Sequence, residues 1–137
     1  MVIAVVRNEP SLEDVVQLSK RRKTDIISVS GEVMHTVVIA EPSEFTTARK
    51  LVEYLNNVTS GNVRVVVDSE GMYVPEEFRI HVGKTSYVKN LNLDFESLHP
   101  FGYYIKLVDK HNLVIAGKRS HNNYAIYDFL KKFCGYR

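Results

Sequence analysis

Residues 102–117 read GYYIKLVDKHNLVIAG, and residues 120–135 continue as SHNNYAIYDFLKKFCG. The first stretch holds two apolar, β-rich runs, 102–108 and 112–117, joined by a short polar connection. A connection this short predicts an antiparallel hairpin of two adjacent strands. The second stretch predicts a helix that begins at a capping serine and ends at a glycine; its apolar positions at helical spacing are Ala125, Ile126, Phe129, Leu130 and Phe133.

The middle of the chain alternates strand-like and helix-like segments. Residues 36–40, TVVIA, form a continuous apolar run that predicts a central strand covered on both faces. Residues 41–44 then open a helix with one apolar face, and a further strand is predicted at 63–67. These segments place a helix between two strands.

The strand predicted within residues 76–83 is expected to be half exposed, because its apolar residues alternate with Arg79 and His81. Between 84 and 100 the pattern is irregular, and its apolar residues are expected to hold a loop or short helix against the body. Together the patterns predict an α+β fold. It is a mixed β-sheet with about three helices packed mainly on one face, and a C-terminal antiparallel hairpin followed by a helix.

Residues 1–33 are interpreted as a β-α-β extension of this core. A strand is predicted at 2–6, a helix capped by Ser11 follows it, and a second strand is predicted at 25–29. The basic run Lys20–Lys23 falls near the end of that helix, where the helix dipole favours cations.

The composition fits a single globular domain. The chain has 137 residues, of which 45% are hydrophobic and 25% charged, and no stretch has the composition of a linker. One domain is therefore expected over 1–137, with its core at 34–137.

Charge, cysteine content and hydropathy limit the partners. The net charge is only +2, so nucleic acid is not a favoured partner in spite of the basic run. No stretch approaches the roughly 18 apolar residues of a membrane helix, which excludes a membrane span. Residues 7–10 interrupt the apolar start before it could serve as a signal peptide. The single cysteine leaves the compartment open, with a secreted parent protein as one alternative.

The sequence offers no constellation of catalytic or metal-binding residues. The histidines lack the spacing of metal ligands, so structural or surface roles are expected for His35, His81, His99, His111 and His121. Glycosidic hydrolysis needs two facing carboxyl groups, and the candidates are Asp68 with Glu70, Glu76 with Glu77, and Asp94 with Glu96. Solvated surface positions are the favoured interpretation of all three pairs. No catalytic residue, metal site or cofactor is predicted.

Other reactive or aromatic residues also have structural interpretations. Cys134 lies on the predicted buried side of the last helix, where a thiol usually serves packing. Ser120 is expected to cap the last helix rather than to bind an anion. A sugar-stacking platform is the alternative to half-buried packing for the tyrosines Tyr73, Tyr87, Tyr103, Tyr104, Tyr124, Tyr127 and Tyr136.

Residues 102–137 resemble the end of a non-catalytic N-terminal domain of several carbohydrate-active enzyme families. In that domain a GY-I strand is followed by an LVIAG strand, a polar turn and a helix of the form YA-YDFL. This chain has Gly102–Ile105, Leu113–Gly117 and Tyr124–Leu130 in the same order and at the same spacing.

The resemblance continues upstream and covers residues 34–137, where the strand at 36–40 and the IHVGK segment at 80–84 follow the family pattern. The domain is similar to the one that precedes the catalytic barrel in alpha-glucuronidases and beta-N-acetylhexosaminidases, the hexosaminidase domain 2-like fold. The resemblance implies a mixed sheet with helices on one face, and it implies that catalytic residues lie in the barrel. The turn after Gly117 departs from the family in lacking its glycine and Arg-Gly step, so no contact made by those residues is carried over.

The resemblance implies a non-catalytic accessory domain that packs against or positions a glycoside-hydrolase barrel of the same or a parent chain. The expected docking surface is the last helix, with Tyr124, Tyr127 and Phe133. The alternative is a free-standing carbohydrate- or protein-binding module of an extracellular or phage-associated assembly, for which polysaccharide would be a ligand. An enzyme in its own right would need a pocket with two carboxylates or a His–carboxylate pair, and the sequence has no motif for either.

Overall fold

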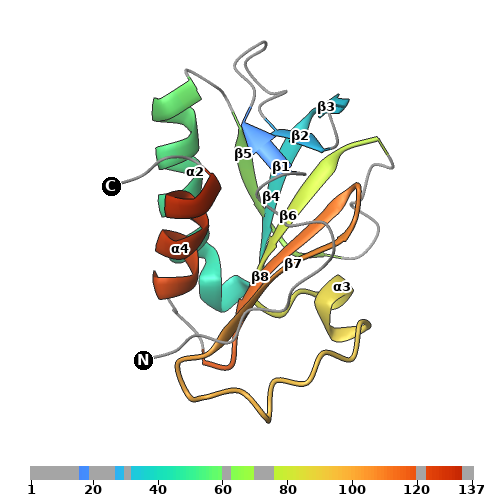
Figure 1. Cartoon of the computed structure of the whole chain (residues 1–137), viewed down its shortest axis with the longest axis vertical. Helices are drawn as coiled ribbons and strands as arrows, with labels where there is room; N and C mark the ends of the chain where they lie inside the picture. Colours follow the sequence, from blue (N-terminus) through green and yellow to red (C-terminus); the bar gives the residue numbers. More distant parts are fainter. Residues whose placement is uncertain are drawn as a thin grey trace.

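The structure is a computed structural model of the chain (Figure 1). The residues that it describes are 16–18, 27–29, 32–59, 63–69, 76–119 and 123–133.

A mixed five-stranded sheet forms the centre of the described part. Its strands lie in the order β5-β4-β6-β8-β7; the first four are parallel to one another, and β7 runs antiparallel to β8. Their bounds are β4 Thr36–Ala40, β5 Arg64–Val67, β6 Phe78–Val82, β7 Tyr103–Asp109 and β8 Asn112–Gly117. The structure thus confirms that 36–40 is an inner strand and that residues 102–117 form an antiparallel hairpin.

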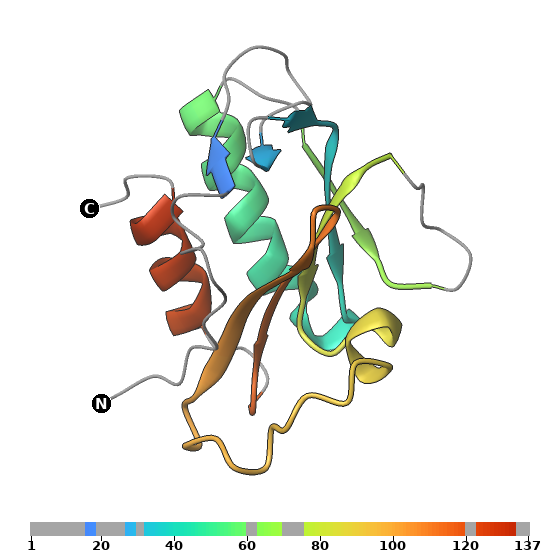
Figure 2. The same ribbon diagram turned by 45° about the vertical axis from the view of Figure 1, so that its right-hand side comes forward.

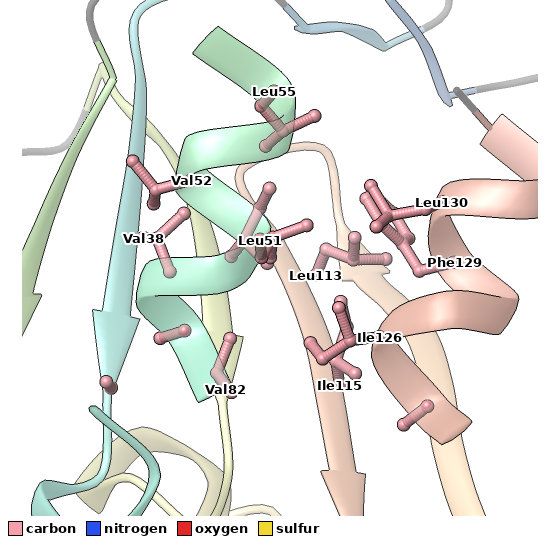
Figure 3. Packing of buried hydrophobic residues seen from close by; sticks show 14 of the residues in the cluster. Val38, Leu51, Val52, Leu55, Val82, Leu113, Ile115, Ile126, Phe129 and Leu130 are labelled. Atoms are coloured by element: carbon pink, nitrogen blue, oxygen red, sulfur yellow. The ribbon is translucent and has the colours of Figure 1, made fainter. Parts of the chain in front are cut away.

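The first face of the sheet carries most of the hydrophobic core. Val38, Ile80, Leu113 and Leu107 are paired in register across four strands and face the same side. Helices α2 (Phe45–Thr59), which follows the short 3-10 helix η1 (Pro42–Glu44), and α4 (Asn123–Phe133) cover this side. In Figure 3 the labelled side chains of both helices point toward the sheet and toward one another. The apolar stripes of both helices therefore have the role that their spacing predicts.

The second face carries Val114 and Ala116 of β8, and it is covered by α3 (Ser86–Lys89) and residues 90–101. Val88 of α3 packs directly against these two side chains. Figure 2 shows α3 on the opposite side of the sheet from α2 and α4. The predicted α+β class is confirmed, with the two long helices on one face and the short one on the other.

The prediction of a wet face on β6 is wrong. Arg79 is 8% exposed and His81 is 0% exposed, and all five residues of the strand are buried. The α3 segment covers this face, and hydrogen bonds to neighbouring side chains satisfy the polar groups. Alternation of polar and apolar residues identifies the two faces of a strand, but it does not say what lies over each.

The helix predicted after Ser11 is wrong at Val16–Leu18, which form strand β1. This strand pairs antiparallel with β2 (Ile27–Val29), which pairs in turn with β3 (Glu32–Met34). Strand pairing supplies long-range backbone partners that outweigh the weak helical preference of the segment. The predicted strand at 25–29 is confirmed at Ile27–Val29, whereas the strand at 2–6, Ser11 and the basic run lie outside the described residues.

Candidate functional site

The outer face of α4 is the candidate functional surface. Ala125, Ile126, Phe129 and Leu130 of this helix are buried in the core beneath it. Tyr124 and Tyr127 remain on the opposite side, where 65% and 46% of their surface is exposed. A spacing of three residues places both rings on the same turn of the helix, and together they form what we call the tyrosine face. Phe133 ends α4, and its side chain lies outside the described part.

A hydrogen bond from the sheet holds α4 in place, and its acceptor also forms an ion pair within the helix. The Tyr103 hydroxyl on β7 donates to Asp128 Oδ2 over 3.0 Å, and Lys132 Nζ lies 3.6 Å from the same oxygen. Burial, and then the hydrogen bond to Asp128, raise the pKa of Tyr103 well above its ordinary value. The phenol therefore stays protonated and continues to link the helix to the sheet.

His81 is a fully buried polar residue in the middle of the second face. Its Nε2 lies 3.0 Å from Asn112 Oδ1, and its Nδ1 lies 3.2 Å from Thr85 Oγ1. The ring stacks on Tyr87 with a centroid distance of 4.5 Å. Arg79 Nε donates to the same Asn112 oxygen over 2.9 Å. We call these five side chains the His81 network.

The hydrogen bonds of the network fix the tautomer of His81. The Asn112 amide nitrogen donates to both oxygens of Asp109, so its Oδ1 faces the ring as an acceptor. The ring must then carry its hydrogen on Nε2 and accept the Thr85 hydroxyl hydrogen at Nδ1. Burial, reinforced by Arg79, lowers the pKa of His81 to about 4 in spite of the Asn112 hydrogen bond. His81 is therefore a neutral structural residue near pH 7.

Polar groups also gather where the parallel strands end, which is the edge at which open α/β sheets usually bind ligands. Here they bind the chain itself. Glu41 Oε1 accepts from the backbone N–H of Lys84 over 2.9 Å, and the Asp68 carboxylate accepts from both the N–H and the hydroxyl of Ser86. Lys118 Nζ donates to two backbone carbonyls of the segment that follows α3. These contacts hold the α3 segment to the sheet.

The same edge is closed by tight packing at Gly83. Its φ is +87°, and a Cβ there would lie 2.6 Å from Glu44 Cγ. A cavity of about 10 Å³ lies between this glycine, α2 and α4, with Thr47 and Ile126 in its wall. That volume holds about one water molecule, so this cavity is far too small for a sugar.

The other histidines were predicted to have structural or surface roles, and two of them contact Glu77. His35 Nε2 lies 3.4 Å from Glu77 Oε2, and His111 Nδ1 lies 3.1 Å from the Glu77 carbonyl oxygen. His99 is an exposed residue whose Nδ1 accepts from the Phe101 N–H. His121 lies outside the described residues. Within the described ranges, no three His, Cys, Asp or Glu residues are grouped as metal ligands would be.

The acidic pairs do not form a facing carboxylate pair in the described structure. Glu77 is nearly buried and binds Arg64 Nη2 over 3.1 Å, whereas Glu76 is exposed. Hydrogen bonds from the Ser97 side chain, and then from the Ser97 N–H, lower the pKa of the Asp94 carboxyl group. Asp68 binds Ser86 as described above, and its proposed partner Glu70 lies outside the described residues. Asp68, Glu77 and Asp94 therefore have local structural roles.

The tyrosines divide between packing and exposure. Tyr103 and Tyr104 are buried, and Tyr87 is half-buried against His81. Tyr73 and Tyr136, together with Cys134 and Ser120, lie outside the described residues. Only Tyr124 and Tyr127 among the described tyrosines of the predicted platform expose a large part of the ring. The structure places two members of the predicted docking surface side by side on α4.

Comparisons with protein-family models, with curated proteins and with solved structures gave no match. The resemblance to the hexosaminidase domain 2-like family therefore stays a prediction based on the sequence motifs. In the described part, none of the helices has the length and apolar character needed to cross a membrane.

Proposed function

We propose that this chain is a non-catalytic accessory domain that docks on a larger protein through the tyrosine face of α4. The observation that carries the proposal is the exposure of two neighbouring phenol rings on a helix whose other side is buried in the core. Tyrosine is enriched in the buried centres of protein interfaces, where its large ring excludes water and its hydroxyl binds polar groups. A surface of this kind suits a protein partner.

The support beneath the tyrosine face favours docking as well. Phe129 is fully buried, and the Asp128 carboxylate is bound by Tyr103 of the sheet. The backbone of α4 is therefore held before a partner arrives, which reduces the entropy lost on binding. The motif resemblance of residues 102–137 makes the catalytic barrel of a carbohydrate-active enzyme the proposed partner, with this domain positioning or stabilising it.

The direct test begins with the gene region around this coding sequence. Where it encodes a barrel, in the same reading frame or the adjoining one, the barrel is produced as a separate polypeptide, mixed with this chain and examined by calorimetry. We expect a complex whose affinity falls at least about tenfold in the Tyr124→Ala, Tyr127→Ala double variant, because exposed aromatics dominate such interfaces. A region without a barrel, or a barrel that does not bind, overturns the proposal.

Val67→Ala provides a matched control for that test. Val67 lies on β5, at the opposite edge of the sheet from β7, and its exposure of 45% is close to that of Tyr127. The control variant should bind the barrel as the unmodified chain does. An equal loss of affinity in the control would show that binding does not pass through the tyrosine face.

The same two rings support a second candidate, a carbohydrate-binding module. Aromatic faces pack on the apolar faces of sugar rings, and the phenol hydroxyls can bind sugar hydroxyls. Glycan-array binding by the unmodified chain that disappears in the double variant would favour this function over docking. Absence of binding across a broad array would overturn it.

A further inference from the structure

The cover of the second face differs from that of the first in being thin and partly polar. Helix α3 has four residues, and Val88 is the one that is buried, packed on Val114 and Ala116. The other apolar side chains of the cover that pack on this cluster are only partly buried: Tyr87, Leu91, Leu93 and Phe95. Much of the remaining attachment consists of side-chain hydrogen bonds, such as those from Ser86 to Asp68. A segment held by few buried side chains is expected to open locally at a lower free energy than the core.

His81 lies beneath this cover and is bound to its first turn. The Thr85 hydroxyl, which donates to His81 Nδ1, is also the N-cap of α3 and accepts from the Val88 N–H over 3.3 Å. Tyr87 of the same helix closes over the imidazole ring. Detachment of α3 would therefore remove Thr85 and Tyr87 from the ring and would admit water to it.

A proton on Nδ1 is unfavourable in this arrangement. The ring would then point an N–H at Thr85 Oγ1, and the hydroxyl hydrogen would lose its acceptor. The imidazolium would also share Asn112 Oδ1 with the Arg79 guanidinium in a buried site. Asp68 and Asp109 favour the charged ring, but burial and Arg79 act against it. In the open state water would solvate the charge instead.

We infer that residues 84–101 are an acid-released cover, which detaches from the second face as a unit when His81 binds a proton, while the α2 and α4 side stays folded. Because the open state binds the proton more tightly than the closed state, acid shifts the population toward the open state. The proton is the ligand that drives this change. The closed and open states of residues 84–101 differ in whether His81 contacts Thr85 and Tyr87.

Hydrogen exchange followed by mass spectrometry tests the inference on the unmodified chain. Protection factors, corrected for the intrinsic pH dependence of exchange, are compared for peptides from 84–101 and from α2. With a ring pKa near 6.5 when open and about 4 when closed, the opening constant of 84–101 should rise about twentyfold between pH 7 and pH 5. The α2 peptides should remain better protected than those from 84–101 at both pH values, because they are exposed only when the first face unfolds as well. Equal protection of the two regions at pH 5, or an unchanged opening constant of 84–101, overturns the inference.

The variant His81→Gln separates the imidazole from other groups that titrate in acid. Its amide N–H can donate to Asn112 as Nε2 does, but it cannot bind a proton, so residues 84–101 should stay protected at pH 5. Asp68→Asn, which removes the carboxylate that binds Ser86, should keep the acid response. An unchanged response in His81→Gln, or a lost response in Asp68→Asn, assigns the trigger elsewhere and overturns the inference.

A measurement on the unmodified chain tests the inference even if His81→Gln fails to fold. NMR titration of the five histidines follows each imidazole while exchange of the Lys89 and Leu91 amides, which are bonded within the α3 turn, is monitored. The His81 signal should titrate together with the loss of protection of these amides. Titration of His81 while the amides stay protected would overturn the inference.

Discussion

The two faces of the central sheet are stabilised in different ways. The first face is covered by helices of 15 and 11 residues and is filled by large apolar side chains. The second face is covered by a four-residue helix and an irregular segment, and the polar His81 network lies within it. Apolar burial scarcely depends on pH, whereas a network built on a neutral imidazole does. We therefore expect the second face to respond to pH more strongly than the first.

The largest difference between the faces should appear when a buried apolar side chain is removed from each. Phe129→Ala, on the first face, should lower the free energy of unfolding by about 4 kcal/mol, because Phe129 is fully buried among the residues of both helices and the sheet. Val88→Ala, on the second face, should cost about 1 to 2 kcal/mol. Urea unfolding followed by circular dichroism measures both, and comparable losses would show that the two covers are equally important.

Acidification should produce the next largest effect. The folded-state pKa of His81 is about 4, below the ordinary value of 6.5, so the unfolded chain binds more protons between these values. Stability therefore falls as the pH drops through this window and levels off below it. The contribution of His81 amounts to about 2 kcal/mol between pH 7 and pH 4.5. Urea titrations at both pH values should show this loss in the unmodified chain and a smaller one in His81→Gln; equal losses would contradict it.

The hairpin and the helix α4 of the first face could be predicted from the sequence, because the patterns that indicate them lie within single segments. The runs at 102–108 and 112–117 and the apolar spacing from Ala125 to Phe133 reside in single segments, so the hairpin and α4 could be predicted. The exposed positions Tyr124 and Tyr127 follow from the same helical spacing. Once the buried positions of a helix are known from their spacing, the exposed positions are known as well.

The second face could not be predicted because its contacts join distant segments. Arg79, His81 and Asn112 meet only when β6 and β8 lie side by side, and Thr85 reaches the ring only after α3 folds back over β6. The alternation in β6 places Arg79 and His81 on one side, which was the available signal. It could not reveal that another segment covers that side. The same limit explains Val16–Leu18, whose pairing with β2 outweighs helical preference.

A single hydroxyl group should contribute less than either of the effects above. Tyr103→Phe removes the donor to Asp128 but keeps the buried ring, and it should lower stability by about 1 kcal/mol. Lys132 remains close to the carboxylate and limits the loss. Urea unfolding at pH 7 measures the change, and Tyr104→Phe, whose hydroxyl binds the Asp94 carbonyl beneath the other cover, is the matched variant. No loss in Tyr103→Phe would show that packing alone positions α4.

The smallest effect is expected on the outer surface of the first face, where Arg49 and Glu53 form an exposed ion pair on α2. Their closest atoms lie 3.9 Å apart, and both side chains are more than half exposed. Glu53→Gln should therefore change the free energy of unfolding by only about 0.3 kcal/mol, and added salt should remove the difference. Glu77→Gln is the matched test of a nearly buried carboxylate, which binds Arg64 and His35, and it should cost more than Glu53→Gln. If Glu53→Gln lowered the free energy of unfolding as much as Glu77→Gln does, the exposed ion pair would contribute to the stability of the first face. The stability of that face would then depend on pH, contrary to what an apolar core predicts.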